Sequence, residues 1–177
     1  QDIGSLQAGN YQLTATDANG CTIIESMTID EPPLLVLDLV QTIPACQGMS
    51  SGSIQVEPSG GTAPYLFNWS NDSLSQNLSG VPAGFYTVTV SDAQGCSDTL
   101  QIALSEWPAL VLTATAIAPG CFGDSTGWID LSLENGVAPV QYQWSNSATS
   151  SSLAGLSAGT FSVVVTDALG CTGTLDI

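Results

Sequence analysis

The chain contains no lysine, arginine or histidine, whereas it carries 16 aspartates and glutamates and a formal net charge of -16. Proteins bind nucleic acids largely through cationic side chains that neutralise phosphates, so this composition excludes that class of partner. Docking on anionic membranes is disfavoured for the same reason, and no long apolar run predicts insertion into a bilayer. Side-chain salt bridges and lysine isopeptide crosslinks are chemically impossible.

The same absences leave little for catalysis. Serine and cysteine nucleophiles lack the histidine or lysine that usually activates them. Only carboxylates remain, and those that recur along the chain open turns, where aspartate has a conformational role. A zinc site is not predicted, because the five cysteines form no CxxC pair and no histidine accompanies them. We therefore expect a protein that is not an enzyme and holds no cofactor.

The sequence does contain one motif that is repeated at a spacing of 75 residues. It runs from Ala-Gly to Asp-x-x-Gly-Cys and occupies residues 8–21, 83–96 and 158–171. A fixed period of this size is the signature of a tandem array in which each repeat is one structural unit.

Division of the array at its prolines gives three segments. Residues 1–32 form the C-terminal part of a truncated repeat, residues 33–107 a complete repeat and residues 108–177 a nearly complete one. The first segment holds too few strands to close a core. We expect it to belong to a longer polymer or to be completed by a neighbouring molecule.

Each repeat is predicted to be an immunoglobulin-like β-sandwich, so the fold class is all-β. Short runs rich in β-branched or alternating apolar residues are separated by clusters of Gly, Pro, Asn and Ser. The clusters recur at the spacing of about 8–12 residues that is typical of β-sandwiches. The 44% of hydrophobic residues suffices to fill a core in each repeat. The strands predicted in the complete repeat are Leu34 to Val40, Ser53 to Glu57, Tyr65 to Trp69, Phe85 to Ser91 and Ser97 to Leu104.

Four aromatic residues are expected in the cores. Trp69 and Trp144 occupy equivalent positions on a middle strand and are the predicted core tryptophans. Tyr86 begins the penultimate strand, which is the position of an immunoglobulin-type tyrosine corner. Phe161 replaces this tyrosine in the third segment, so the corner there loses its hydroxyl and depends on packing.

Several of these recurring positions resemble those of a known family. The complete repeat is similar to the SprB repeat in four motifs. These are Cys46-x-Gly48, Gly60-Gly61-x-x-Pro64-Tyr65, Trp69-Ser70-Asn71 and the segment from Gly84 to Cys96. This family occurs in very large cell-surface adhesins of gliding Bacteroidota that are exported by the type IX secretion system. The resemblance implies a secreted or surface-attached repeat protein with roles in adhesion, gliding motility or filament building.

We accordingly expect an extracellular, structural protein that forms a stiff stalk or fibre. Its partners would be neighbouring repeats, other copies in a fibre and surface polysaccharide. Two alternatives stay open at this point. One is a filament subunit that polymerises by strand complementation, and the other is an adhesive module that binds glycans or surfaces.

Two cysteines per repeat in an extracellular setting predict disulfides. Cys46 and Cys96 are expected at opposite ends of one sandwich, separated by roughly 23–33 Å of strand, whereas bonded cysteines need Cα atoms within about 7 Å. This geometry favours Cys46 with Cys171, across the junction of neighbouring repeats. Pairing within each repeat, Cys46 with Cys96 and Cys121 with Cys171, stays open. So does pairing of Cys21 with Cys46 and Cys96 with Cys121 around a hairpin bend.

Acidic residues near the junctions suggest weak calcium candidates. Asp92 and Asp167 open the hairpin turns, while Glu31 and Glu106 lie in the linkers, so a junction could gather carboxylate oxygens. An aspartate that opens an Asp-x-x-Gly turn needs no metal, however, and no EF-hand loop is present. Diffuse screening by cations is the stronger expectation.

Surface chemistry adds two hypotheses. Ser73, Thr99 and Ser125 each follow aspartate and precede another residue of the kind found in the O-glycosylation motifs of the implied lineage. Trp107 interrupts the repeat in the linker and is expected to pack between the second and third units. A lone tryptophan beside a proline favours this packing role over a sugar-stacking platform.

Overall fold

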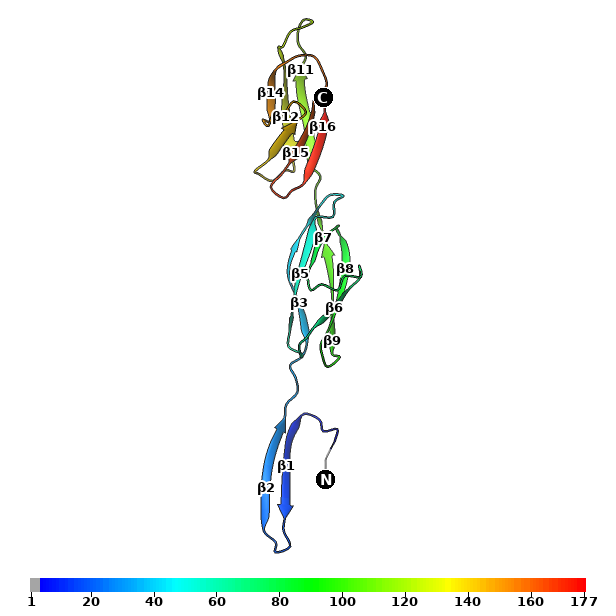
Figure 1. Ribbon diagram of the computed structural model, residues 1–177, viewed down its shortest axis with the longest axis vertical. Helices are drawn as coiled ribbons and strands as arrows, with labels where there is room; N and C mark the ends of the chain where they lie inside the picture. The colour runs from blue at the N-terminus through cyan, green and yellow to red at the C-terminus, as the bar shows by residue number, and fades with distance from the viewer. Residues whose placement is uncertain (1–3) are drawn as a thin grey trace.

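The computed structural model describes residues 4–177, and its regular structure consists of β-strands (Figure 1). The strands form three successive units: a two-stranded hairpin and two sandwiches of paired three-stranded sheets. The units follow one another along the long axis of Figure 1. The all-β class and the repeated immunoglobulin-like sandwich confirm the fold predicted from the sequence.

The first unit is an antiparallel hairpin of β1 (Gly9–Thr16) and β2 (Thr22–Ile29). Its turn is closed by Asp17, whose carboxylate Oδ1 accepts hydrogen bonds from the backbone N–H groups of Asn19 and Cys21. The two strands pair with each other alone among the described residues, so apolar side chains such as Leu13 and Met27 stay about 60% exposed (60% and 59%).

The second unit packs two sheets face to face. One sheet has the order β3 (Val36–Ile43), β5 (Gly52–Ser59) and β7 (Leu78–Val81). The other has the order β6 (Leu66–Trp69), β8 (Gly84–Ser91) and β9 (Ser97–Leu104). The sequence predicted five of these strands and missed β7, which is four residues long and contains a glycine and a serine.

The third unit repeats this arrangement. Its sheets are β11 (Val111–Ile117), β12 (Gly127–Glu134) and β14 (Ser152–Leu156), and β13 (Gln141–Trp144), β15 (Ser162–Thr166) and β16 (Thr172–Asp176). Two short strands lie between the sandwiches: β4 (Ala45–Cys46) in the first loop of the second unit and β10 (Glu106–Trp107) in the linker.

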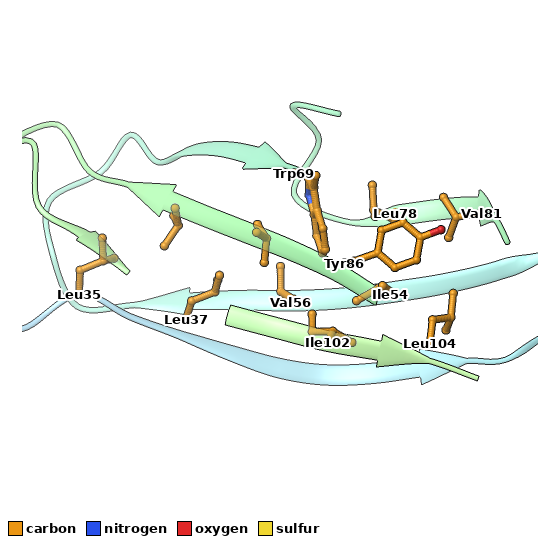
Figure 2. Packing of buried hydrophobic residues seen from close by; sticks show 12 residues of the cluster. Leu35, Leu37, Ile54, Val56, Trp69, Leu78, Val81, Tyr86, Ile102 and Leu104 are labelled. Carbon is orange, nitrogen blue, oxygen red and sulfur yellow. The ribbon is translucent and has the colours of Figure 1, made fainter. Parts of the chain in front are cut away.

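Each core is centred on its tryptophan. Trp69 and Trp144 are each 2% exposed, and their indole N–H groups donate to the carbonyl oxygens of Ser75 and Ser150 at 2.7 and 2.8 Å. In the second unit the indole lies beside aliphatic side chains from both sheets (Figure 2). Because a buried indole is so large, its replacement by alanine would cost about 3–5 kcal/mol.

The corner residues differ between the units as the sequence indicated. The Tyr86 hydroxyl donates to the carbonyl oxygen of Pro82 at 2.8 Å, four residues upstream. The Tyr11 hydroxyl donates in the same way to Gln7 at 2.6 Å. Phe161 has no hydroxyl and is only half-buried, while its backbone pairs in both directions with Ile177, as Tyr86 pairs with Ile102 in the second unit. The third corner thus keeps the backbone pairing and lacks only the hydroxyl hydrogen bond.

Candidate functional site at the junction of two sandwiches

The first loop of the second unit receives the linker that leads into the third. Strand β10 of the linker pairs in parallel with β4, with Glu106 opposite Ala45 and Trp107 opposite Cys46. The Ala45 N–H also donates to the carbonyl oxygen of Ser105 at 3.1 Å. The linker is therefore a short added strand rather than a free connection.

A hairpin turn of the third unit meets this loop from the other side. Asp167 opens the turn between β15 and β16, and its Oδ1 accepts from the backbone N–H groups of Leu169 and Cys171, each at 2.9 Å. Its Oδ2 accepts from the Val137 N–H at 3.2 Å, which ties the turn to the neighbouring loop. The carboxylate thereby fixes the backbone that carries Cys171.

A disulfide joins the two surfaces. Cys46 and Cys171 are bonded with their Cα atoms 5.3 Å apart and a sequence separation of 125 residues. This is the pairing that the end-to-end geometry favoured. The pairings within a repeat, and those around a hairpin bend, are absent, because Cys21, Cys96 and Cys121 are exposed thiols. The bonded cysteines are buried at 3% and 4% exposure.

Two polar side chains hold the linker between the sandwiches. Gln47, from the second unit, accepts the backbone N–H of Ala109 at its Oε1 at 3.0 Å. Asn135, from the third unit, donates to the carbonyl oxygen of the same Ala109 at 3.1 Å. Neither Gln47 nor Asn135 was predicted from the sequence. The available signal was their failure to repeat, since Phe122 and Gly60 stand at the equivalent positions.

The acidic junction candidates have different surroundings. Asp92 is buried, and its carboxylate accepts from the backbone N–H groups of Thr62, Gln94 and Cys96 at 2.8–2.9 Å. Burial acts to raise the pKa of Asp92, but these backbone hydrogen bonds outweigh it and hold the pKa below its usual range. Both Asp92 and Asp167 thus use their oxygens to accept backbone hydrogen bonds.

The linker acids are more open. Glu31 borders a shallow hollow together with Asp92, Pro33 and Leu35, and Glu106 is an exposed residue of β10. Within residues 4–177, no cluster of three or more candidate ligands gathers to hold a metal ion. Calcium binding at a junction stays a prediction, and it would have to compete with the backbone for the two turn aspartates.

The three glycosylation candidates all lie at or near the surface. Thr99 is exposed on β9, where its hydroxyl meets that of Thr89 at 3.1 Å, and exposed Ser125 meets Ser157 at 2.9 Å. Ser73 is half-buried in the loop after β6. Trp107 lies on β10 at the junction with 37% of its surface exposed, so its ring is covered only in part.

The fold and the junction define a class: tandem β-sandwich repeats joined end to end. The family model of the SprB repeat matches residues 40–74 and 119–149, one segment in each sandwich. SprB repeats are found in cell-surface proteins, so the two matches indicate an extracellular repeat module of the adhesion type. The resemblance drawn from the sequence is confirmed.

Other comparisons are more distant. No curated protein matches the chain. Among solved structures, a crystal structure of the first two immunoglobulin domains of Dpr2, in complex with three such domains of DIP-Theta, is 10% identical with a TM-score of 0.30. That alignment covers 96% of this chain and 72% of the other. In the described part of the chain, no helix is long and apolar enough to cross a membrane.

Proposed function

We propose that the chain is a non-catalytic, stiff spacer, a segment of an extracellular stalk or fibre. The observation that carries the proposal is the junction between the sandwiches. It combines a disulfide, a paired linker strand and two hydrogen bonds from side chains to the backbone of Ala109. Domains joined by a small free interface move relative to one another by default. A junction fastened at several points restricts that motion.

The composition supports the same proposal. All ionised side chains have one sign, so neighbouring units repel one another where salt does not screen them. Repulsion along a string of units favours the extended form. Ions of the extracellular medium would moderate this repulsion without any specific metal site.

The stiffness can be tested by small-angle X-ray scattering of the full chain before and after reduction. We expect the maximum dimension of the oxidised chain to be larger and less variable than that of the reduced chain, because Cys46–Cys171 limits bending at the junction. A chain with Cys46→Ser and Cys171→Ser is the matched control and should scatter like the reduced protein. Identical curves for all three would contradict the stiff-spacer function.

An adhesive module is the second candidate, and one surface favours it. A shallow hollow on the second sandwich is bordered by Tyr65, Phe67 and the exposed apolar side chains of Leu66 and Leu74. Aromatic rings beside polar groups are suited to stacking on sugars. Binding of the full chain to a panel of bacterial surface polysaccharides, and its loss in Tyr65→Ala, would favour this function over a pure spacer.

Polymerisation by strand complementation draws support from the first unit. The face of β1 and β2 that carries Leu13 and Met27 lacks a covering sheet among the described residues. Strands from another copy could cover it and build a filament. Analytical ultracentrifugation over a range of concentrations would reveal such assembly, and a monomer at all concentrations would count against it.

Glycosylation would suit any of these extracellular roles. Ser73, Thr99 and Ser125 are the proposed O-linked sites; Thr99 and Ser125 are exposed, so glycans there would stay in solvent, whereas Ser73 is half-buried in its loop. Intact mass spectrometry of the native protein should show masses above that of the bare polypeptide. Bare masses alone would remove the proposal.

A further inference from the structure

The free end of the third sandwich carries an exposed thiol whose equivalent in the second sandwich is bonded. Cys121 stands 75 residues after Cys46 in the repeat and is exposed, whereas Cys46 is bonded to Cys171 and buried. We propose that Cys121 is a covalent docking site for the hairpin cysteine of a further repeat that follows the third. The inference rests on the proposed array and extends it to a second, overlapping bridge.

The second sandwich shows what occupies such an end. There the backbone N–H of Ala45 donates to Ser105, and β4 pairs with the linker strand β10. In the third sandwich, the equivalent residues Gly120 and Cys121 form no strand, and both are exposed. Within residues 4–177, this end has neither of the partners that its counterpart has, a linker strand and a bonded cysteine. Both partners of the counterpart, β10 and Cys171, lie after Cys46 in the sequence.

The surface around Cys121 has the features expected of a site that contacts a neighbouring repeat. Phe122 is fully exposed, although the equivalent Gln47 binds the backbone of the following linker. A shallow hollow runs from Pro119 to Asp124 and continues to Ser157 and Ala158. An apolar ring, an open backbone edge and a thiol thus lie together at the position where the second sandwich holds its neighbour.

The covering repeat must present its cysteine as the third sandwich presents Cys171. The Asp167 turn does so, and Asp17 and Asp92 build the same turn around Cys21 and Cys96. A linker strand can reach the Gly120–Cys121 edge only if it continues from the last strand of the third sandwich. This requirement selects a repeat joined in sequence over a second copy of the chain.

Bond formation needs a disulfide oxidant such as oxidised glutathione. The Cys121 thiolate attacks one sulfur of oxidised glutathione and releases one glutathione. The thiolate of the incoming cysteine then attacks Cys121 sulfur and releases the second glutathione. Two thiols are oxidised to one disulfide, and one glutathione disulfide is reduced to two thiols.

The test extends the array by one period. A second copy of residues 103–177 is appended after Ile177, which keeps the 75-residue register and places the copied Cys171 at 125 residues from Cys121, the separation seen for Cys46 and Cys171. After equilibration with glutathione buffer, we expect two disulfides and three free thiols among the seven cysteines. Peptide mapping should join Cys121 to the appended copy of Cys171.

Three results would overturn the proposal: five free thiols, a bond between Cys121 and the original Cys171, or disulfide-linked dimers of the original chain through Cys121. The matched control is Cys121→Ser in the extended chain, which should retain one disulfide and four free thiols among its six cysteines. Small-angle scattering of the original chain tests the spacer function separately, because that chain lacks the appended partner.

Discussion

Single aspartates do much of the local organisation in this protein. Asp17, Asp92 and Asp167 each accept two backbone hydrogen bonds within their own turns, and the last two also reach the preceding loop of the same sandwich. A carboxylate that accepts several N–H groups satisfies donors that a tight turn would otherwise leave without partners. In a chain without cations, the backbone takes the place of the usual counter-charge.

Asp92→Asn should weaken the second sandwich in a pH-dependent way. The folded pKa of Asp92 is lowered, so its contribution to stability is present above the unfolded value of about 3.9 and is lost as pH falls through the folded pKa. The asparagine amide cannot accept the Thr62 N–H with its nitrogen. We expect the urea midpoint, followed by NMR signals of Val88 and Val90, to fall at neutral pH.

The difference between wild type and Asp92→Asn should then close in acid, because the wild-type carboxylate becomes protonated. Asp38→Asn is the control, since Asp38 is exposed on β3 and should leave the midpoint unchanged. A difference that stays constant down to pH 2 would show that the charge of Asp92 contributes nothing.

At the scale of elements, the chain contains one hairpin in two environments. The hairpin of β1 and β2 is equivalent to that of β8 and β9, and Leu13 corresponds to Val88. Val88 is fully buried beneath the opposite sheet, while Leu13 is 60% exposed. An uncovered two-stranded hairpin is only marginally stable in water, so burial rather than local sequence decides how firmly this element is held.

Amide hydrogen exchange should separate the two hairpins. We expect the Leu13 amide of the full chain to exchange near the rate of an unfolded peptide, and the Val88 amide to be protected by at least about 10³-fold. The comparison controls itself because both amides belong to one molecule. Comparable protection at Leu13 would mean that another copy covers the first hairpin.

The sequence predicted those elements whose signals are local and repeated. Alternating Tyr86 to Val90 and the Asp92 turn identified β8 and the hairpin, and recurrence identified the tryptophan cores. Strand β7 was not predicted, because its own residues have little strand preference and it forms only by pairing with β5. The two hydrogen bonds to Ala109 were not predicted, because Gln47 acts across the junction and neither Gln47 nor Asn135 has a counterpart in the other repeat.

At the scale of the molecule, a length argument from the sequence favoured the Cys46–Cys171 disulfide but left two other pairings open, and the structure decides between them. A sandwich is too long for its two ends to share one bond, so a cysteine at one end has to find its partner in the neighbouring unit. The paired linker strand could not be foreseen in this way. It depends on the backbone course of Ser105 to Trp107 beside Ala45, which neither residue type nor spacing specifies.

The Cys46–Cys171 bond also determines how the molecule responds when its two ends are pulled apart. Force applied at the termini passes from Cys46 directly to Cys171, so the residues between them carry no tension along the chain. Most of both sandwiches lies within this bypassed loop. Reduction would expose a hidden length of about 410–450 Å, at 3.3–3.6 Å per extended residue over the 125-residue separation.

Single-molecule stretching should therefore record two behaviours of one chain. Without reductant, we expect extension of the terminal segments alone, and with reductant, two further unfolding steps that together release this length. The Cys46→Ser chain should give the reduced record without any reductant, and equal extension with and without reductant would show that the bond carries no load. With a covalent bypass of this kind, the maximum extension of the molecule under force depends on the thiol–disulfide balance of its surroundings. The stability of either core does not set that extension.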